Sequence, residues 1–404
     1  EIEELMFRNQ YILTNKAIKV TEDINQLSIA NFSLHFGKDI EHYTIQKENK
    51  QITLLGYVFH CYNNKIEQEL ITNLFELNEQ ALLDELDCWC GHFVVFIAGE
   101  TFQVYNDACA SFKVFYGEND GYKSIGSDPK ILTQFLNFKE DKRPEKLKFY
   151  QSDYFLKNKI RAGNETKFEK LFQLTANQHL NIGDLESRRN FPRRKRIEIS
   201  EQEACGKLIP IFNNLILNIN KRYNIYTSIT AGFDSRVSMA ATKKYSKEIT
   251  YYTFKFPNKA EDYIDYRIPK QITSKLNLKY ILKPLINKLP EIEKEKILSS
   301  YTTPRLKAFL QYFEEFPKNE KENILMTGGV SEVAKNYLEN VPISTGKHIV
   351  RAIHFPDNAY LFNYYQSWLD KNQLTINSFD YNLLDIVHWE QDITSFAGQN
   401  MHYA

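Results

Sequence analysis

Residues 230–236 read Thr-Ala-Gly-Phe-Asp-Ser-Arg and join a β-prone run at residues 225–229 to a segment that favours a helix. Small residues at a strand-to-helix turn let backbone N–H groups approach an anion, and the helix start adds unpaired donors and the positive end of its dipole. Asp234 would repel a phosphate unless a cation lay between them. The stretch therefore predicts a loop for magnesium-bound phosphates.

An ordinary turn is the alternative interpretation of this stretch. Gly232 would then make a tight bend, and Asp234 or Ser235 would cap the following helix. The Gly-x4-Gly-Lys-Ser/Thr spacing of the P-loop nucleoside triphosphatases is absent from the stretch, which argues against that class.

The stretch resembles the pyrophosphate loop of the asparagine synthetase-like ATP pyrophosphatases, whose pattern is Ser-Gly-Gly-x-Asp-Ser with Thr and Ala tolerated at the first two places. Downstream segments predict a strand at Ile249–Phe254, a helix at Asp262–Lys275 and a strand at Lys279–Leu282. This alternation predicts a parallel sheet, in which ligands bind at the carboxyl ends of the strands.

A second loop, Thr-Gly-Gly-Val-Ser-Glu at residues 327–332, follows a predicted strand at 323–326 and resembles the family's Ser-Gly-x-Gly-x-Asp-Glu loop. The resemblance implies that its backbone surrounds AMP and that a carboxylate binds a second magnesium. Ser331 stands at the aspartate position, and Glu332 follows it. Either Glu332 reaches the cation, or Ser331 and water bind it more weakly. An ordinary strand-to-helix turn with a first-turn acid is the alternative.

The resemblance also implies roles for individual residues. The expected ATP contacts are Thr230, Ala231, Gly232, Phe233, Asp234, Ser235, Phe254, Thr327, Gly328 and Gly329. Asp234 and Glu332 are the expected magnesium ligands, and with Arg236 they form the expected catalytic set. Arg236 could pair with pyrophosphate oxygens or, equally, with a nearby carboxylate. Core packing is an equal alternative for Phe254, and a solvated helix face is favoured for Asp265 over a role beside the pyrophosphate.

The first 150 residues read as short alternating segments that predict a β-rich structure. The predicted strands are 10–13, 51–57, 92–97, 101–105, 112–116 and 122–125, with a helix near 66–86. The segments Gly91-His92-Phe93, Asp107 and Ser127-Asp128-Pro129-Lys130 occur in the order of the family's glutaminase-type domain. The resemblance implies an α+β, Ntn-type β-sandwich with helical layers, followed by an α/β parallel-sheet ATP pyrophosphatase domain of the adenine nucleotide α-hydrolase-like kind.

The 404 residues exceed what one core usually holds and predict two domains. Residues 1–187 are expected to form a glutaminase-like domain without its catalytic cysteine, 188–200 a basic linker and 201–404 the ATP pyrophosphatase domain. Six Lys and Arg residues lie within the nine residues 188–196. They could bind an anion or a nucleic acid, but a solvated connection between domains is favoured because charge runs are usually exposed.

The composition argues against several classes of function. Lys plus Arg and Asp plus Glu number 51 each, so the global charge does not favour nucleic acid or membrane partners. The five cysteines include no CxxC pair, which favours a reduced, intracellular protein. No apolar run approaches the ~20 residues needed to cross a bilayer, and the acidic start is not a signal peptide. We therefore expect a cytoplasmic protein.

One departure from the family concerns the N-terminal domain. In glutamine-using members the first residue is a cysteine that acts as the nucleophile, whereas this chain begins with Glu1 and has no cysteine before Cys61. We therefore expect a structural N-terminal domain without glutaminase activity.

The resemblance implies an ATP-dependent carbon–nitrogen ligase of the AMP-forming kind, with Mg²⁺ as its cofactor. A carboxylate would form an acyl-adenylate and release pyrophosphate, and an amine that does not derive from glutamine would then attack. The expected partners are small-molecule or peptide carboxylates and amines, with no membrane or nucleic acid, and a homodimer is left open. Two alternatives remain: a non-catalytic or nucleotide-binding scaffold, and an adenylating enzyme of another pyrophosphate-loop class.

Overall fold

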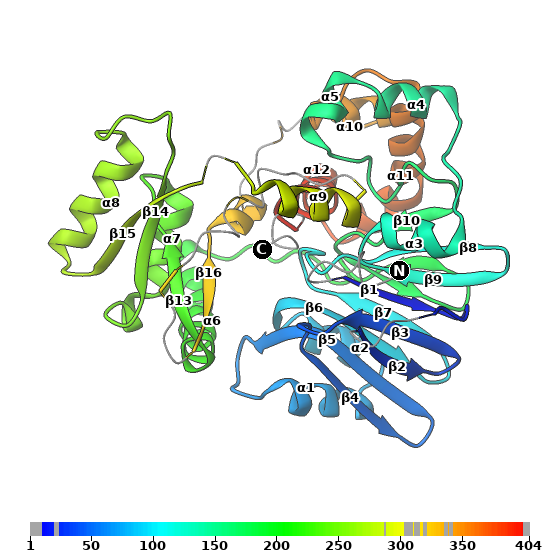
Figure 1. Cartoon of the computed structure of the whole chain (residues 1–404), viewed down its shortest axis with the longest axis horizontal. Coiled ribbons are helices and arrows are strands. Elements are labelled where there is room, and N and C mark those ends of the chain that lie inside the picture. The colour runs from blue at the N-terminus through cyan, green and yellow to red at the C-terminus, as the bar shows by residue number, and fades with distance from the viewer. Residues whose placement is uncertain are drawn as a thin grey trace.

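The computed structural model describes residues 10–19, 24–286, 288–302, 310, 316–317, 321–334, 338 and 342–398, without the side chains of 332–334 and 396–397. Two antiparallel sheets of six strands each form the N-terminal half, and a parallel sheet of four strands lies to one side of them (Figure 1). The fold is therefore a mixture of α and β structure with both kinds of sheet, as the sequence predicts.

The two antiparallel sheets have the strand orders β10-β8-β9-β1-β3-β2 and β12-β11-β7-β6-β5-β4. The strands of the first sheet are β1 (Tyr11–Thr14), β2 (Ile24–Ile29), β3 (Phe32–Gly37), β8 (Phe115–Asn119), β9 (Tyr122–Gly126) and β10 (Leu171–Gln173). Those of the second sheet are β4 (His42–Lys47), β5 (Lys50–His60), β6 (Trp89–Ala98), β7 (Phe102–Asn106), β11 (Gln178–Asn181) and β12 (Glu186–Arg189).

The two sheets pack face to face because their strands alternate apolar side chains between two faces. In β6, Val94 and Phe96 enter the core between the sheets, whereas Val95 and Ile97 enter a second core on the opposite face. Because both faces of such a strand are apolar, each face must pack against another layer of the structure.

Helices supply those covering layers. The second sheet is covered by α1 (Glu67–Asn73), the short 3-10 turn η1 (Leu74–Glu76) and α2 (Glu79–Leu86). The outer face of the first sheet is covered by α3 (Pro129–Leu136). The N-terminal half is thus a β-sandwich between helical layers.

Several elements differ from their predictions. The helix predicted near 66–86 is interrupted at Asn78, whose side chain accepts a hydrogen bond from the Ala81 N–H and begins α2. The strand predicted at 112–116 begins only at Phe115, because the Asp107 carboxylate accepts hydrogen bonds from the backbone N–H groups before it and holds them in a loop. No prediction covers β2 or β4, which are polar strands at the edges of their sheets.

The parallel sheet has the order β15-β14-β13-β16. Its strands are β13 (Tyr223–Ser228), β14 (Thr250–Lys255), β15 (Lys279–Pro284) and β16 (Glu322–Met326). The helices that precede and connect them are α6 (Glu201–Arg222), α7 (Phe233–Ala241), η2 (Lys243–Tyr245), α8 (Ile264–Lys275) and α9 (Glu291–Ser300). The predicted alternation of strands and helices is confirmed, and every neighbouring pair of strands runs parallel.

The last helices pack against the N-terminal half of the chain (Figure 1). They are α10 (Gly346–Ala352), α11 (Ala359–Ser378), α12 (Leu383–Val387) and the π-helical η5 (His388–Ala397), and they meet α4 (Pro144–Tyr150) and α5 (Asp153–Asn158). Leu361 and Tyr365 of α11 share one hydrophobic core with Phe149 and Phe155. Residues on both sides of the boundary predicted at 201 therefore belong to one packed unit.

The basic linker is held by carboxylates. Arg193 and Arg194 form ion pairs with Asp84 of α2. Arg189 pairs with Glu390, and both side chains are largely buried, which departs from the solvated connection that the charge run predicts. Within the described residues, no helix combines the length and the apolar character needed to cross a membrane.

Candidate nucleotide-binding site

The two predicted loops meet at the carboxyl edge of the parallel sheet. They follow β13 and β16, which are neighbours with Thr227 opposite Met326. A Cβ added to Gly328 would lie 2.8 Å from the backbone carbonyl carbon and 2.9 Å from the Cβ of Asp234. The structure therefore brings Asp234 of the first loop against the second loop, a contact that only glycine permits at position 328. We call this edge, formed by residues 229–236 and 327–331, the loop edge.

Side-chain hydrogen bonds hold the first loop in shape. The hydroxyl of Ser235 accepts a hydrogen bond from the Thr230 N–H at 2.9 Å and contacts the Thr230 hydroxyl at 3.1 Å. The Gly232 N–H donates to the Thr230 hydroxyl at 3.1 Å. Both hydroxyls predicted as phosphate donors thus also bond each other, and Ser235 is buried.

The start of α7 has no side-chain cap, and Gly232 occupies its N-cap position. Because the first N–H groups of a helix have no partner within the helix, an uncapped start is a ready place for an anion. Gly232 itself is exposed.

Arg236 lies in the first turns of the same helix. Its Nε donates to the Gly232 carbonyl at 3.2 Å, and its guanidinium lies 4.6 Å from the centroid of the Phe233 ring. Among the described residues, no carboxylate forms an ion pair with Arg236, so the ion-pair interpretation finds no partner there. Phe233 is 77% exposed, which leaves this aromatic and cationic pair at the surface of the loop edge.

Asp265 contacts the loop directly. Its carboxylate accepts a hydrogen bond from the Ala231 N–H at 2.9 Å, across 34 residues of sequence. Asp265 therefore orients the backbone of the first loop, rather than standing on a solvated face of α8. The sequence signal was its match to an acidic residue of the resembled family in the helix after the second strand.

A second support was not predicted. The hydroxyl of Thr253 in β14 donates to the Ile229 carbonyl at 2.6 Å, and it contacts the Tyr280 hydroxyl at 3.0 Å. Ile229 is the last residue before the first loop, so this chain of hydroxyls fixes where the loop begins. The sequence feature that could have indicated this support is a threonine near the end of a buried strand.

Phe254 is buried in the core below the loop edge. It packs beside Tyr252, with ring centroids 5.1 Å apart, and beside Phe316 at 6.3 Å. These contacts correspond to the core-packing interpretation of this residue. Phe256, two residues further along the chain, is 43% exposed.

The second loop closes on itself through Ser331. Its backbone N–H donates to the Gly328 carbonyl at 3.2 Å, and its hydroxyl donates to the same oxygen. Ser331 thereby stabilises the turn, at the position where the sequence resemblance predicts an aspartate. Thr327, Gly329 and Glu332 lie in or beside this turn, in or just before η4 (Gly329–Ala334), and the side chain of Glu332 is outside the described residues.

The region that resembles the glutaminase site is packed with internal hydrogen bonds. Asp107 accepts from the hydroxyl of Ser111 at 2.8 Å, and this hydroxyl contacts Nδ1 of His92 at 2.9 Å. Burial lowers the pKa of His92 to about 4, so its ring is neutral near pH 7. Lys113 donates to the backbone carbonyl of Thr394 in η5. Helix η5 thus covers this region.

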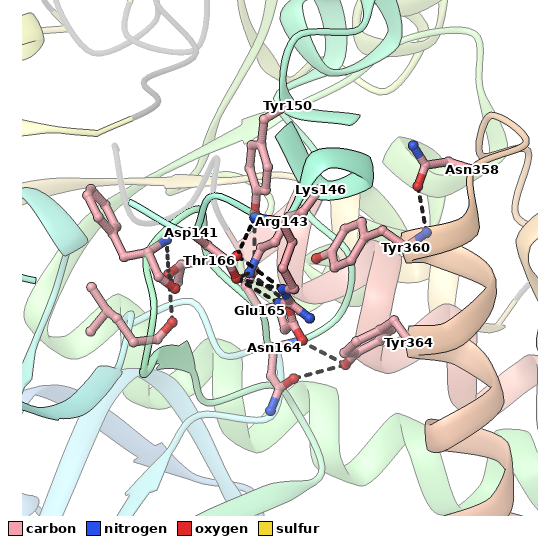
Figure 2. A network of polar contacts seen from close by, with 12 residues as sticks. Asp141, Arg143, Lys146, Tyr150, Asn164, Glu165, Thr166, Asn358, Tyr360 and Tyr364 are labelled. Carbon is pink, nitrogen blue, oxygen red and sulfur yellow. Dashed lines mark hydrogen bonds and ion pairs between the residues drawn. The ribbon is translucent and has the colours of Figure 1, made fainter. Parts of the chain in front are cut away.

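A cavity of about 500 Å³ lies elsewhere, between residues 143–146, residues 163–165 and α11. None of the residues that line it belongs to the loop edge. Arg143, Lys146 and Glu165 line it, and together with Asp141 they form ion pairs that we call the crevice network (Figure 2). Burial alone would raise the pKa of Asp141, but hydrogen bonds from Arg143 and Lys146 outweigh it and hold this pKa well below its usual range.

The comparisons with known proteins are distant. No family model and no curated protein matches the chain. One similar solved structure is a glutamine phosphoribosylpyrophosphate amidotransferase from B. subtilis complexed with ADP and GMP, with 9% identity and a TM-score of 0.23 over 62% of this chain and 51% of the other. Another is described as the allosteric regulatory enzyme of purine biosynthesis, with 10% identity and a TM-score of 0.27 over 74% and 67%.

The chain thus spans about half the length of the first of these structures. Likenesses at such TM-scores carry no argument about function. The candidate site therefore rests on the sheet order and on the contacts at the loop edge.

Proposed function

We propose that the protein is an ATP-dependent carbon–nitrogen ligase that activates a carboxylate as its adenylate and passes the acyl group to an amine. The observation that carries this proposal is the contact of Asp234 with Gly328, which joins two glycine-containing loops on neighbouring parallel strands. Ligands of open parallel sheets bind at the carboxyl ends of the strands, where this contact lies.

The loop edge has the groups that a triphosphate needs. The uncapped start of α7 provides N–H donors and the positive end of the helix dipole. The exposed guanidinium of Arg236 lies one turn further along and is available to the phosphates, where it would stabilise the charge that builds on departing pyrophosphate. The neighbouring Phe233 presents a flat apolar face to the same side.

The donor set fits a magnesium ion that is held together with substrate phosphates. Magnesium usually binds one or two carboxylates, retains several waters and takes its remaining ligands from phosphates. Asp234 lies at the anion site and would hold the ion, with Glu332 as the second predicted ligand. The described residues contain no group of three His, Cys, Asp or Glu side chains placed for a metal. When bound, the ion would neutralise phosphate charge.

Two residues behind the loop would keep it in position for the reaction. Asp265 restrains the Ala231 N–H, and Thr253 restrains the Ile229 carbonyl. Rigid support of this kind keeps donors aimed at the charge that develops on the phosphates, without a cost of reorganisation during the reaction.

The amine would come from a source other than this chain's N-terminal half. The polar groups around Asp107, in the region that resembles a glutaminase site, bond one another. The N-terminal half instead supports the ATP-binding unit: Asp128 accepts from the N–H and the hydroxyl of Thr302, and Gln10 donates to the Ser300 carbonyl.

One observation favours a second candidate, a nucleotide-binding scaffold without ligase activity. Ser331 stands where the family has a metal-binding aspartate, and its hydroxyl is used to close the turn. Such a protein would bind MgATP at the loop edge but would not release pyrophosphate.

Calorimetry with MgATP tests the site. We expect saturable binding by the wild type and an affinity at least about tenfold lower for Asp234→Asn, because a carboxylate that faces a metal is lost. Asp385→Asn is the matched control, since Asp385 is also a first-turn aspartate, is exposed and belongs to α12. No binding at millimolar ATP would exclude both candidates.

Pyrophosphate release then separates the two candidates. We expect release only when a carboxylic substrate is present, measured over a panel of amino acids, sugar acids and peptides, each with and without an added amine. Saturable MgATP binding without release under any of these conditions would favour the scaffold.

A further inference from the structure

Two thiols face each other at the end of the second sheet. Strands β5 and β6 run antiparallel with Phe59 opposite Cys90, and just beyond β5 the Cys61 N–H donates to the Cys88 carbonyl at 2.8 Å. This pairing places the sulfur atoms of Cys61 and Cys90 3.6 Å apart. None of the five cysteines, all of which lie in the described residues, forms a disulfide.

From this geometry we propose that Cys61 and Cys90 form an oxidisable pair, in which a peroxide converts the two thiols to a disulfide. A disulfide needs a sulfur–sulfur distance of about 2.05 Å, so the two atoms must approach by roughly 1.5 Å. Cys90 is exposed, which gives a small oxidant access, whereas Cys61 is buried at 8% exposure. This pairing does not depend on the proposed ligase activity.

The third nearby thiol is directed away from the pair. Cys88 donates its S–H to the Asp84 carbonyl at 3.4 Å, on the side of α2. The hydrogen bond between the two thiols lowers the pKa of Cys61 and raises the pKa of Cys90 well above its usual value. The thiol that keeps its proton then serves as the resolving thiol for the other.

The chemistry balances with peroxide as the oxidant. The thiolate of one partner attacks one peroxide oxygen, the O–O bond breaks, and hydroxide leaves and takes up a proton as water. The second thiol then attacks the sulfur of the resulting sulfenic acid, the S–S bond forms, and the oxygen leaves as a second water with the proton of the second thiol. Two thiols and one peroxide thus give one disulfide and two waters.

The pair lies where α6 is attached to the N-terminal half. Asn214 of α6 donates to the carbonyls of His60 and Cys61 at 3.0 and 3.2 Å, and Asn218 donates to the Asn63 carbonyl at 3.0 Å. Helix α6 runs directly into β13, which leads to the loop edge. A disulfide at Cys61 would therefore restrain the segment that holds α6.

Mass spectrometry of the full chain tests the pair. After treatment with hydrogen peroxide we expect one cross-linked peptide pair that joins Cys61 to Cys90, a loss of two hydrogens, and full reversal by dithiothreitol. Cys205→Ser should form the same cross-link, because Cys205 lies alone on α6, and Cys90→Ser should not form it. A cross-link that joins Cys88 instead, or sulfinic acid at Cys61 with no cross-link in the wild type, would overturn the proposal.

Hydrogen exchange tests the link to α6. We expect slower exchange across residues 201–222 in the oxidised protein than in the same sample after reduction, with unchanged exchange in α3 as an internal reference. Equal exchange of α6 in both states would overturn the restraint on this helix. Neither measurement uses nucleotide, so their outcome is separate from that of the ATP experiments.

Discussion

The loop edge and the crevice network are both polar, but they use their polar groups in opposite ways. In the crevice network two cations and two carboxylates saturate each other, with Lys146 only 2% exposed and 2.7 to 2.9 Å from both acids. At the loop edge the side-chain hydrogen bonds between Thr230 and Ser235 stay within the first loop, an aromatic and a guanidinium are exposed, and a helix start has no cap. The first arrangement stabilises the fold, whereas the second is suited to bind a ligand. A large cavity lined by satisfied charges is therefore weaker evidence for chemistry than a small open loop.

Removing the cation at the centre of the crevice network should have the largest effect. Lys146→Ala leaves Asp141 and Glu165 partly buried without this cation, and we expect the free energy of unfolding to fall by about 3 kcal/mol. Lys167→Ala, which breaks an exposed pair with Glu140, should cost about 0.5 kcal/mol. Urea denaturation of both variants measures the two losses in the free energy of unfolding. Equal losses would show that the buried network stabilises the protein no more than the exposed pair does. MgATP affinity should stay unchanged in both.

The pH dependence of stability should identify the same network. Because the folded-state pKa of Asp141 lies below its unfolded value of about 3.9, its contribution is fully present above that pH and is lost as the pH falls through the folded pKa. Asp141→Asn should therefore be less stable than the wild type at pH 6, and the difference should shrink below about pH 4. Urea midpoints from pH 6 to pH 3 give the comparison, and a constant difference would exclude this role.

Crowding the contact between the two loops should weaken nucleotide binding. In Gly328→Ala the new Cβ would lie 2.8 Å from the Asp234 backbone, so the loops must separate, and we expect MgATP affinity to fall about tenfold, or about 1.4 kcal/mol. Gly329→Ala is the matched control, because its nearest neighbour would be the Thr327 hydroxyl at 3.7 Å. Calorimetry should show the control within about twofold of the wild type, since its new Cβ makes only an ordinary contact. If both variants lowered the MgATP affinity equally, the contact of Gly328 with Asp234 would not belong to the binding site.

The smallest expected effect concerns the support behind the first loop. Asp265→Ala removes the acceptor of the Ala231 N–H, but the bonds between Thr230 and Ser235 remain. We expect the MgATP affinity to fall about threefold. This loss of binding free energy is smaller than the energy of a charged hydrogen bond. Asp262→Ala, an exposed change just before α8, should have no effect. If Asp265→Ala lowered the free energy of unfolding but not the MgATP affinity, Asp265 would stabilise the fold, as the crevice network does, and would have no part in nucleotide binding.

Much of the fold follows from local pattern. The β-prone run, the small residues and the following helix at 225–241 predict β13, the first loop and α7, because each of these depends on residues within a few positions of one another. The apolar run of β6 likewise predicts a strand. The edge strands β2 and β4 escaped prediction, because each is six residues long and carries at most three apolar residues.

The candidate site is less predictable, because the pairing of strands in the sheet brings together residues that are far apart in the sequence. Phe254 reads equally well as a base contact or as core, and its burial beside Phe316 depends on a segment more than sixty residues away in the sequence. Helix α11 follows the parallel sheet in the chain but packs on α4, which the order of segments does not reveal.

The sequence by itself determined that a strand lies at residues 225–229, that a small-residue loop follows it and that a helix comes next. These features come from backbone preferences and from bonds that span at most five residues, such as that of Thr230 with Ser235. The tertiary structure alone decided that Asp234 meets Gly328 and that Asp265 restrains Ala231. Such contacts exist because parallel pairing aligns the ends of distant strands, and no local preference encodes which strands become neighbours.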